Sequence, residues 1–134
     1  MPGTPTPNLN LTLPTVGGDA NLWGGELNGN MTIIDSLALT PSVSVSSNFV
    51  AAVNTSGPEI TYRVTTGASN VTGTLPAANT CPGKIVNMKK VDSGAGQAIL
   101  SGAIDGGTSY IRPAQYSYVR VQSNGTTWDV IGNG

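Results

Sequence analysis

The feature that most constrains this chain is the close, regular spacing of its turn residues. From Glu59 onward, short runs of alternating apolar and polar residues are interrupted about every 8 to 12 residues by Gly, Pro, Asn or Asp. This spacing is typical of β sandwiches and barrels. We therefore expect an all-β fold in residues 59–134, a short-stranded antiparallel β sandwich or prism preceded by an extended arm and one short helix.

The strongest local signal is a hairpin near the end of the chain. Two alternating runs, 116–122 and 127–131, flank Asn124-Gly125. Both of these residues tolerate the positive φ angles of a type I′ turn, whose twist matches that of paired strands. Further strands are expected at 42–46, 48–53, 59–66, 71–75, 84–90, 98–100 and 109–112, and turns at 92–96 and 105–107.

The first 58 residues follow a different pattern and form the expected N-terminal arm. Residues 1–8 are rich in Pro and Thr, which favour an extended chain. The residues after them alternate as a short strand, with Leu9, Leu11 and Leu13 on one face. We place the end of the arm at Pro58, so the expected domains are 1–58 and 59–134.

Within the arm, apolar residues recur every three or four positions and predict a helix over about 19–38, with Asp19 as its N-cap. Three glycines lie inside this segment, and each costs a helix about 1 kcal/mol relative to Ala. We expect the helix to form mainly when its apolar face docks on a partner. That face consists of Trp23, Leu27, Met31, Ile34 and Leu37.

Composition points to self-association. Gly, Pro, Ser, Thr and Asn make up half of the chain, and charged residues make up only 10%. A β module of about 75 residues with mostly small and medium side chains buries little surface and is marginal alone. The chain has one Cys, so no internal disulfide can compensate. We therefore predict an obligate oligomer.

Composition also excludes several kinds of chemistry. The chain has no His, which removes the Ser-His-Asp triad and the commonest zinc ligand. Its seven carboxylates are scattered, and Asp92 and Asp105 stand beside Gly in turns, where Asp commonly bonds the backbone. We expect no catalytic residue, no metal site, no cofactor and no enzymatic activity. Lys89-Lys90, the one basic pair, is interpreted as the solvated end of a strand, and no nucleic-acid or membrane partner is expected.

Two stretches, covering about three quarters of the chain, resemble proteins of tailed bacteriophages. The first runs from Pro7 to Asn28 (PNLNLTLPTVGGDANLWGGELN) and is followed by Ile34-Asp35. It is similar to N-terminal segments of virion proteins, often fibre proteins, in which a strand, a Gly-Gly-Asp turn, a Trp-Gly helix and an Ile-Asp end recur.

The second stretch resembles a β module common in phage fibre and virion-surface proteins. The matching series is Tyr62-x-Val64, Leu75-Pro-Ala, Gly83-Lys-Ile-x-x-Met-Lys-Lys-Val-Asp92, Ile104-Asp-Gly106, Tyr116 to Val121, Ser123-Asn-Gly-Thr and Trp128-x-Val-Ile131. The chain departs from the usual pattern at Ser93–Gly96, where an aromatic or Ser-Ala-Asn run is customary.

The resemblance implies a structural protein on the virion surface, assembled in the host bacterial cytoplasm. It implies a homotrimer that docks on the major capsid protein or another virion protein through its arm. Long tail fibres run to several hundred residues, so a chain of 134 residues favours a capsid decoration or a short head or collar fibre. Expected docking residues are Leu9, Leu11, Leu13, Trp23, Leu27, Met31 and Ile34. Expected oligomer-interface or core residues are Ile60, Tyr62, Val64, Ile85, Tyr116, Tyr118, Trp128 and Val130.

A second reading stays open, a short tail fibre or adsorption protein that binds a host surface glycan. Exposed tyrosines are the usual platform for a sugar ring, and Tyr110, Tyr116 and Tyr118 are the candidates. Their clustering on an exposed groove would favour receptor binding, and their burial at subunit contacts would favour decoration.

Overall fold

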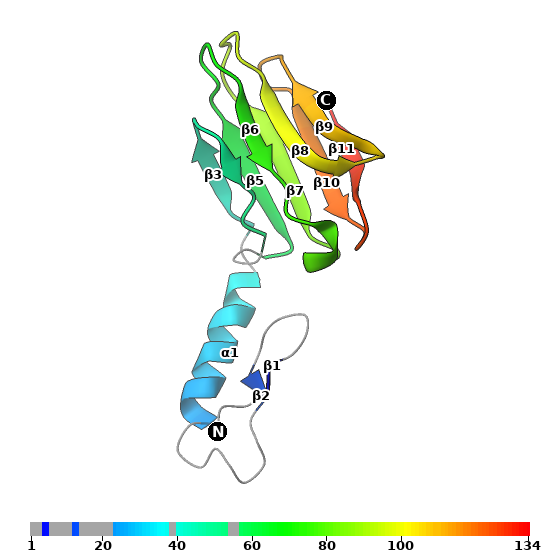
Figure 1. The fold of residues 1–134 in the computed structure, drawn as a ribbon. Helices are drawn as coiled ribbons and strands as arrows, with labels where there is room; N and C mark the ends of the chain where they lie inside the picture. Colours follow the sequence, from blue (N-terminus) through cyan, green and yellow to red (C-terminus); the bar gives the residue numbers. More distant parts are fainter. Residues whose placement is uncertain (1–3, 6–11, 14–22, 38–39, 54–56) are drawn as a thin grey trace. The chain divides into compact units, whose positions relative to one another are not determined.

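The computed structural model describes residues 4–5, 12–13, 23–37, 40–53 and 57–134, and the chain divides into two compact units (Figure 1). Unit 1 is Met1–Leu39 and unit 2 is Thr40–Gly134. The division therefore falls before Thr40 and not after Pro58, where the sequence had placed it. Residues 42–50 belong to unit 2 because they supply two strands to its sheet.

Unit 1 contains a two-stranded antiparallel ladder and one helix. The ladder joins β1 (Thr4–Pro5) to β2 (Thr12–Leu13), and the helix is α1 (Trp23–Leu37). The helix lies within the range expected from the apolar spacing. The expected N-cap, Asp19, and most of the expected strand at Leu9–Leu13 lie outside the described residues.

Unit 2 is one nine-stranded sheet of short strands that folds back on itself into two facing layers, a nearly closed, sandwich-like barrel, so the expected all-β class with one short helix is confirmed. Its described elements are β3 (Ser42–Val45), β4 (Phe49–Val50), β5 (Glu59–Val64), β6 (Val71–Thr74), the 3-10 helix η1 (Ala78–Thr80), β7 (Ile85–Lys90), β8 (Ala98–Ile104), β9 (Gly107–Arg112), β10 (Tyr118–Ser123) and β11 (Trp128–Asn133).

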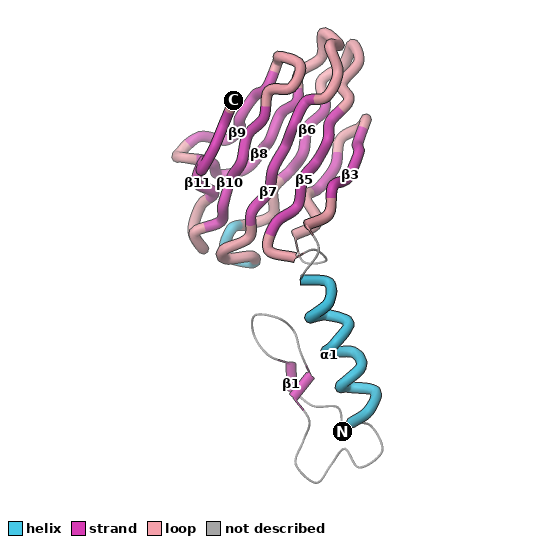
Figure 2. Tube along the Cα trace, turned by 180° about the vertical axis from the view of Figure 1, so that it is seen from behind, coloured by secondary structure: helices cyan, strands magenta, loops and turns pink. Residues whose placement is uncertain are grey.

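The first six strands of unit 2 form three successive turns of a coil. Each turn contributes one strand to the first layer of the folded sheet (β3, β5, β7) and the next strand to the facing layer (β4, β6, β8). Figure 2 shows β3, β5 and β7 side by side in the first layer. Neighbouring strands of one sheet therefore run in the same direction, and the pairs β3–β5, β5–β7, β4–β6 and β6–β8 are parallel. The antiparallel pairing expected from the sequence holds only for the later strands β9, β10 and β11.

Asn side chains link successive turns of the coil at equivalent corners. The Asn48 side-chain oxygen accepts the backbone N–H of Thr72 at 2.8 Å. One turn later, the Asn70 side-chain oxygen accepts the backbone N–H of Gln97 at 2.9 Å. Each bond satisfies a backbone donor at a point where the chain passes between the sheets.

The far end of the coil is closed by the antiparallel strands. β10 pairs with β7, β11 pairs with β10, and a single parallel bridge between Trp128 and Ile104 joins β11 to β8. The core between the sheets is apolar, and Trp128, Met88 and Leu100 are among its largest fully buried side chains.

The two glycine turns near the end of the chain differ from each other. At the β8–β9 turn, both Asp105 (φ +46°) and Gly106 (φ +79°) have the positive angles of a type I′ turn. At the predicted hairpin, of the two central residues only Gly125 has a positive φ, +90°. The Asn124 side chain accepts the backbone N–H of Thr126 and of Thr127 there, so the hairpin was predicted correctly and its turn type wrongly.

Candidate functional site

The helix α1 presents an apolar stripe to solvent. Leu27, Met31 and Ile34 are 50%, 55% and 45% exposed, and their spacing of four and three residues places them on one side of the helix. Trp23 begins the same helix, and Leu13 lies in β2. Leu9 and Leu11 fall outside the described residues. Three members of the predicted stripe are therefore exposed on one side of the helix, and the side chains of the other two, Trp23 and Leu37, lie outside what the structure describes.

The residues expected in the oligomer interface or core separate into two groups. Ile60, Tyr62, Val64 and Trp128 are buried within one copy of the chain. Ile85 and Val130 are half-buried, and Val130 packs against the core. Tyr116 and Tyr118 are exposed in the single chain, so they are not core residues.

The three candidate tyrosines have different environments. Tyr110 packs against the core, and the Arg112 guanidinium lies over its ring at 4.5 Å. Tyr116 precedes β10 with a φ of +64°, is 63% exposed and has the Lys89 ammonium 5.6 Å from its ring centre. Tyr118, the first residue of β10, is 41% exposed. The first of them is thus structural, and the other two remain available to a ligand.

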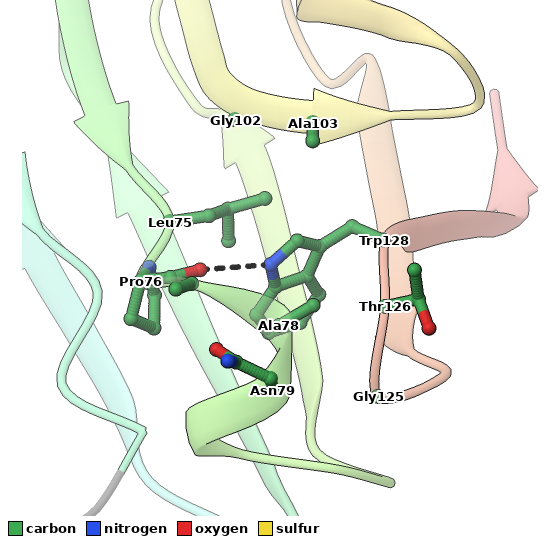
Figure 3. Close-up of a pocket in the computed structure, with 10 residues that line it drawn as sticks. Leu75, Pro76, Ala78, Asn79, Gly102, Ala103, Gly125, Thr126 and Trp128 are labelled. Atoms are coloured by element: carbon green, nitrogen blue, oxygen red, sulfur yellow. Dashed lines mark hydrogen bonds between the residues drawn. The ribbon is translucent and has the colours of Figure 1, made fainter.

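A shallow cavity of about 500 Å³ opens at one end of the sandwich, between η1, the end of β8 and the β10–β11 turn (Figure 3). One wall is the indole of Trp128, whose Nε1–H donates to the Pro76 carbonyl at 3.0 Å. The lining residues are Leu75, Pro76, Ala77, Ala78, Asn79, Gly102, Ala103, Gly125, Thr126 and Trp128. None of them is ionisable, so this cavity has no group for acid–base chemistry.

The carboxylates of unit 2 serve structural contacts. Asp105 accepts the backbone N–H of Val130 at 3.1 Å, and Asp129 accepts two hydrogen bonds from the Asn124 amide. Glu59 forms a surface ion pair with Arg120 at 2.9 Å. Within the described ranges, no cluster of three or more Cys, Asp or Glu side chains could hold a metal ion.

The least expected feature is an ion pair between a buried lysine and a partly exposed aspartate, Lys90 and Asp92, at the other end of the sandwich. Lys90, predicted to be solvated, is fully buried. It lies on the same face of β7 as Val86 and Met88, because residues two apart in a strand share a face, and this alternation was the sequence signal for its burial. Its Nζ donates to the carbonyls of Asp92 at 2.9 Å and Gly94 at 2.7 Å, and to the Asp92 carboxylate at 3.3 Å.

The Asp92 carboxylate ties this strand end to the neighbouring loop. It accepts the backbone N–H groups of Thr66 at 3.0 Å, Gly67 at 2.8 Å and Gly94 at 3.2 Å. These donors, with Lys90, hold the pKa of the carboxyl well below its usual range. The sequence interpretation of Asp92 as a turn residue that bonds the backbone is confirmed.

Cys81 is buried next to η1, and burial raises the pKa of its thiol, which keeps it protonated at neutral pH. In the part of the chain that the structure describes, no helix is both long and apolar enough to cross a membrane.

Comparison with known proteins adds no relative to this picture. No protein-family model matches the chain, and no curated protein or solved structure shows significant similarity to it.

Proposed function

We propose that this chain is a non-enzymatic structural protein of a bacteriophage virion. In this proposal it is a capsid decoration protein or a short head or collar fibre, and its N-terminal unit attaches it to the major capsid protein or another virion protein. The resemblance of residues 7–35 and 59–134 to phage virion proteins supplies the class. The observation that carries the attachment is the exposed apolar stripe on α1.

The energetics of that stripe suit a docking segment. Full burial of a Leu, Ile or Met side chain contributes about 1.5 to 3 kcal/mol. Leu27, Met31 and Ile34 are each about half exposed, so covering the rest yields about 1 kcal/mol for each. Gly24, Gly25 and Gly29 destabilise the helix by a comparable total of about 3 kcal/mol. A partner surface that covers the stripe would therefore offset the weakness of the helix.

Unit 2 has the features of a structural module that stands on the virion surface. It has its own core, few charges, and no ionisable group in its cavity. The resemblance further implies that copies associate as a homotrimer on the virion surface.

Binding to virus particles tests the attachment. Particles assembled without this chain should bind the purified full-length protein in a sedimentation assay, and a variant that begins at Thr40 should stay folded but fail to bind. Met31→Asp should reduce binding at least tenfold, whereas Asn28→Asp, an exposed change off the stripe on the same helix, should not. Binding by the truncated chain would show that the attachment lies elsewhere.

A second candidate function is adsorption to a host surface glycan as a short tail fibre, and the exposure of Tyr116 and Tyr118 favours it. Aromatic faces of this kind stack on sugar rings. The double change Tyr116→Ala and Tyr118→Ala should abolish binding to host cell-wall polysaccharide if this function holds, and Ile131→Ala, which alters another exposed apolar side chain, should not. Unchanged particle binding by the tyrosine variant would separate the two functions.

A further inference from the structure

The coil of unit 2 is open at its first turn. The continuous path of strands begins at β3 and ends at β4, and among the described residues no strand pairs with the outer edge of either. Figure 2 shows β3 at the outside of its sheet, beside β5. The opposite end is closed by β9, β10 and β11, so the two ends of the coil differ.

Backbone hydrogen-bonding groups point outward along the edge of β3. The Pro41 and Val45 carbonyls accept the N–H groups of Thr61 and Thr65, both at 2.9 Å. Because successive residues of a strand direct their backbone groups to opposite sides, the N–H and C=O groups of Ser42 and Ser44 face away from β5. A strand edge of this kind is a template for another strand.

The apolar core of the sandwich also extends to the open end, at β3 and β4. In the parallel register, Met88, Tyr62 and Val43 occupy corresponding positions on β7, β5 and β3. Met88 is fully buried and Tyr62 is 3% exposed, but Val43 is 38% exposed. The Phe49 ring stacks on Tyr62 at 4.3 Å between the sheets and remains half-buried. The apolar interior therefore reaches the open end without a final covering layer.

The edge strands are short, four residues in β3 and two in β4, which is itself a protection, but charged side chains and bulges are missing from them. Proteins commonly block such edges with charged side chains, especially Lys, or with bulges. The sequence from Ser36 to Pro58 has no charged residue, and the described pairing of β3 and β4 has no register shift. Identical edges can therefore approach each other without repulsion between like charges.

The two open edges, β3 and β4, lie at the same end of the coil, and this arrangement indicates which partner can pair with them. Facing sheets lie about 10 Å apart, so a single extended peptide can complete only one of them. The open end of a second copy supplies two strands at the required spacing. We propose that two copies of this chain join end to end, β3 to β3 and β4 to β4, about a twofold axis perpendicular to the sheets.

In this pairing the strands are antiparallel and Ser44 of one copy lies opposite Ser44 of the other. Val43 then faces Val45 of the second copy on the inner side, and both sheets become continuous across the contact. A twofold contact is closed, so it produces an even number of copies. The inference rests on the self-association in the proposed function, whose threefold contact it would extend to a hexamer. A dimer would show this twofold contact without the proposed homotrimer.

The mass of the full-length protein in solution tests this inference. Sedimentation equilibrium at micromolar concentration should give two or six times the 13.6 kDa chain mass. Ser44→Lys places a charge opposite its own copy and should halve that mass, while circular dichroism shows an unchanged fold. Ser109→Lys, an exposed serine on β9, should leave the mass unchanged.

Two results would overturn the inference. One is a monomer or trimer of the wild-type chain, which would leave the open end to a different protein. The other is an even-numbered assembly whose mass neither Ser44→Lys nor Ser42→Lys reduces. Both are independent of the particle-binding assay, so the self-pairing and the virion attachment can fail separately.

Discussion

Replacing Lys90 by Met tests whether the ion pair between Lys90 and Asp92 stabilises unit 2. The Met side chain keeps most of the apolar volume but removes three donated hydrogen bonds, two of them to the backbone carbonyls of Asp92 and Gly94. An acceptor left without a donor costs about 1 to 3 kcal/mol, and these carbonyls belong to partly exposed residues, so the lower value applies to each.

Two effects oppose each other in this variant. Burying the ammonium of Lys90 in the native protein costs several kcal/mol, and the Met variant avoids that cost. Replacing both members of a buried pair by apolar residues is often neutral, but here the carbonyls and the carboxylate stay behind. Removing one member of a buried pair costs about 3 to 5 kcal/mol net, because the other charge stays behind. The Asp92 carboxylate keeps three backbone N–H donors and its side chain is 21% exposed, so we expect a smaller net loss of about 2 kcal/mol.

Urea unfolding measures the difference, with Trp23→Phe as background so that Trp128 alone reports on unit 2. For a unit of this size an m-value of about 1.5 kcal/mol/M is typical, so the midpoint should fall by about 1.3 M. Lys89→Met is the matched control, because its side chain lies on the opposite, exposed face of the same strand, and it should change stability by less than about 0.5 kcal/mol. An unchanged midpoint for Lys90→Met, or an equal loss for Lys89→Met, would refute the reasoning.

Three further predictions concern the stability of the protein in acid, the tryptophan wall of the cavity, and the space around two glycines. Folding lowers the pKa of Asp92, so its contribution to the free energy of unfolding is complete above its unfolded pKa of about 3.9 and is lost as pH falls below that value. Asp92→Asn should therefore reduce the fall in stability that the wild-type protein shows in acid. Trp128→Phe removes the bond to the Pro76 carbonyl and part of the core volume, and thermal unfolding should show a loss of about 2 kcal/mol. Gly96→Ala should lower the melting temperature because its Cβ would collide with a backbone carbonyl, whereas Gly25→Ala, with open space around it, should raise the helical circular dichroism signal of α1.

Local patterns predicted the individual elements well. The recurrence of Leu27, Met31 and Ile34 indicated both the helix and its exposed face, and Asn124-Gly125 indicated the final hairpin. These predictions succeeded because side-chain periodicity and turn chemistry depend on residues close together in the chain. Alternation along β7 could also have placed Lys90 inside, but a charged residue is rarely buried without partners. Those partners, Asp92 and Gly94, act through geometry that appears only once the loop is folded.

The sequence by itself determined that this chain is a β protein with short strands, one glycine-weakened helix and a low charge, because composition and periodicity are local properties. Only the tertiary structure decided that β3 to β8 form a parallel coil between two sheets. Parallel pairing depends on where a strand returns after crossing to the other sheet, and alternation of side chains is the same in either direction. The open edge at β3 and β4 follows from that path and not from any residue on it, which is why the sequence pattern assigned residues 42–50 to the arm.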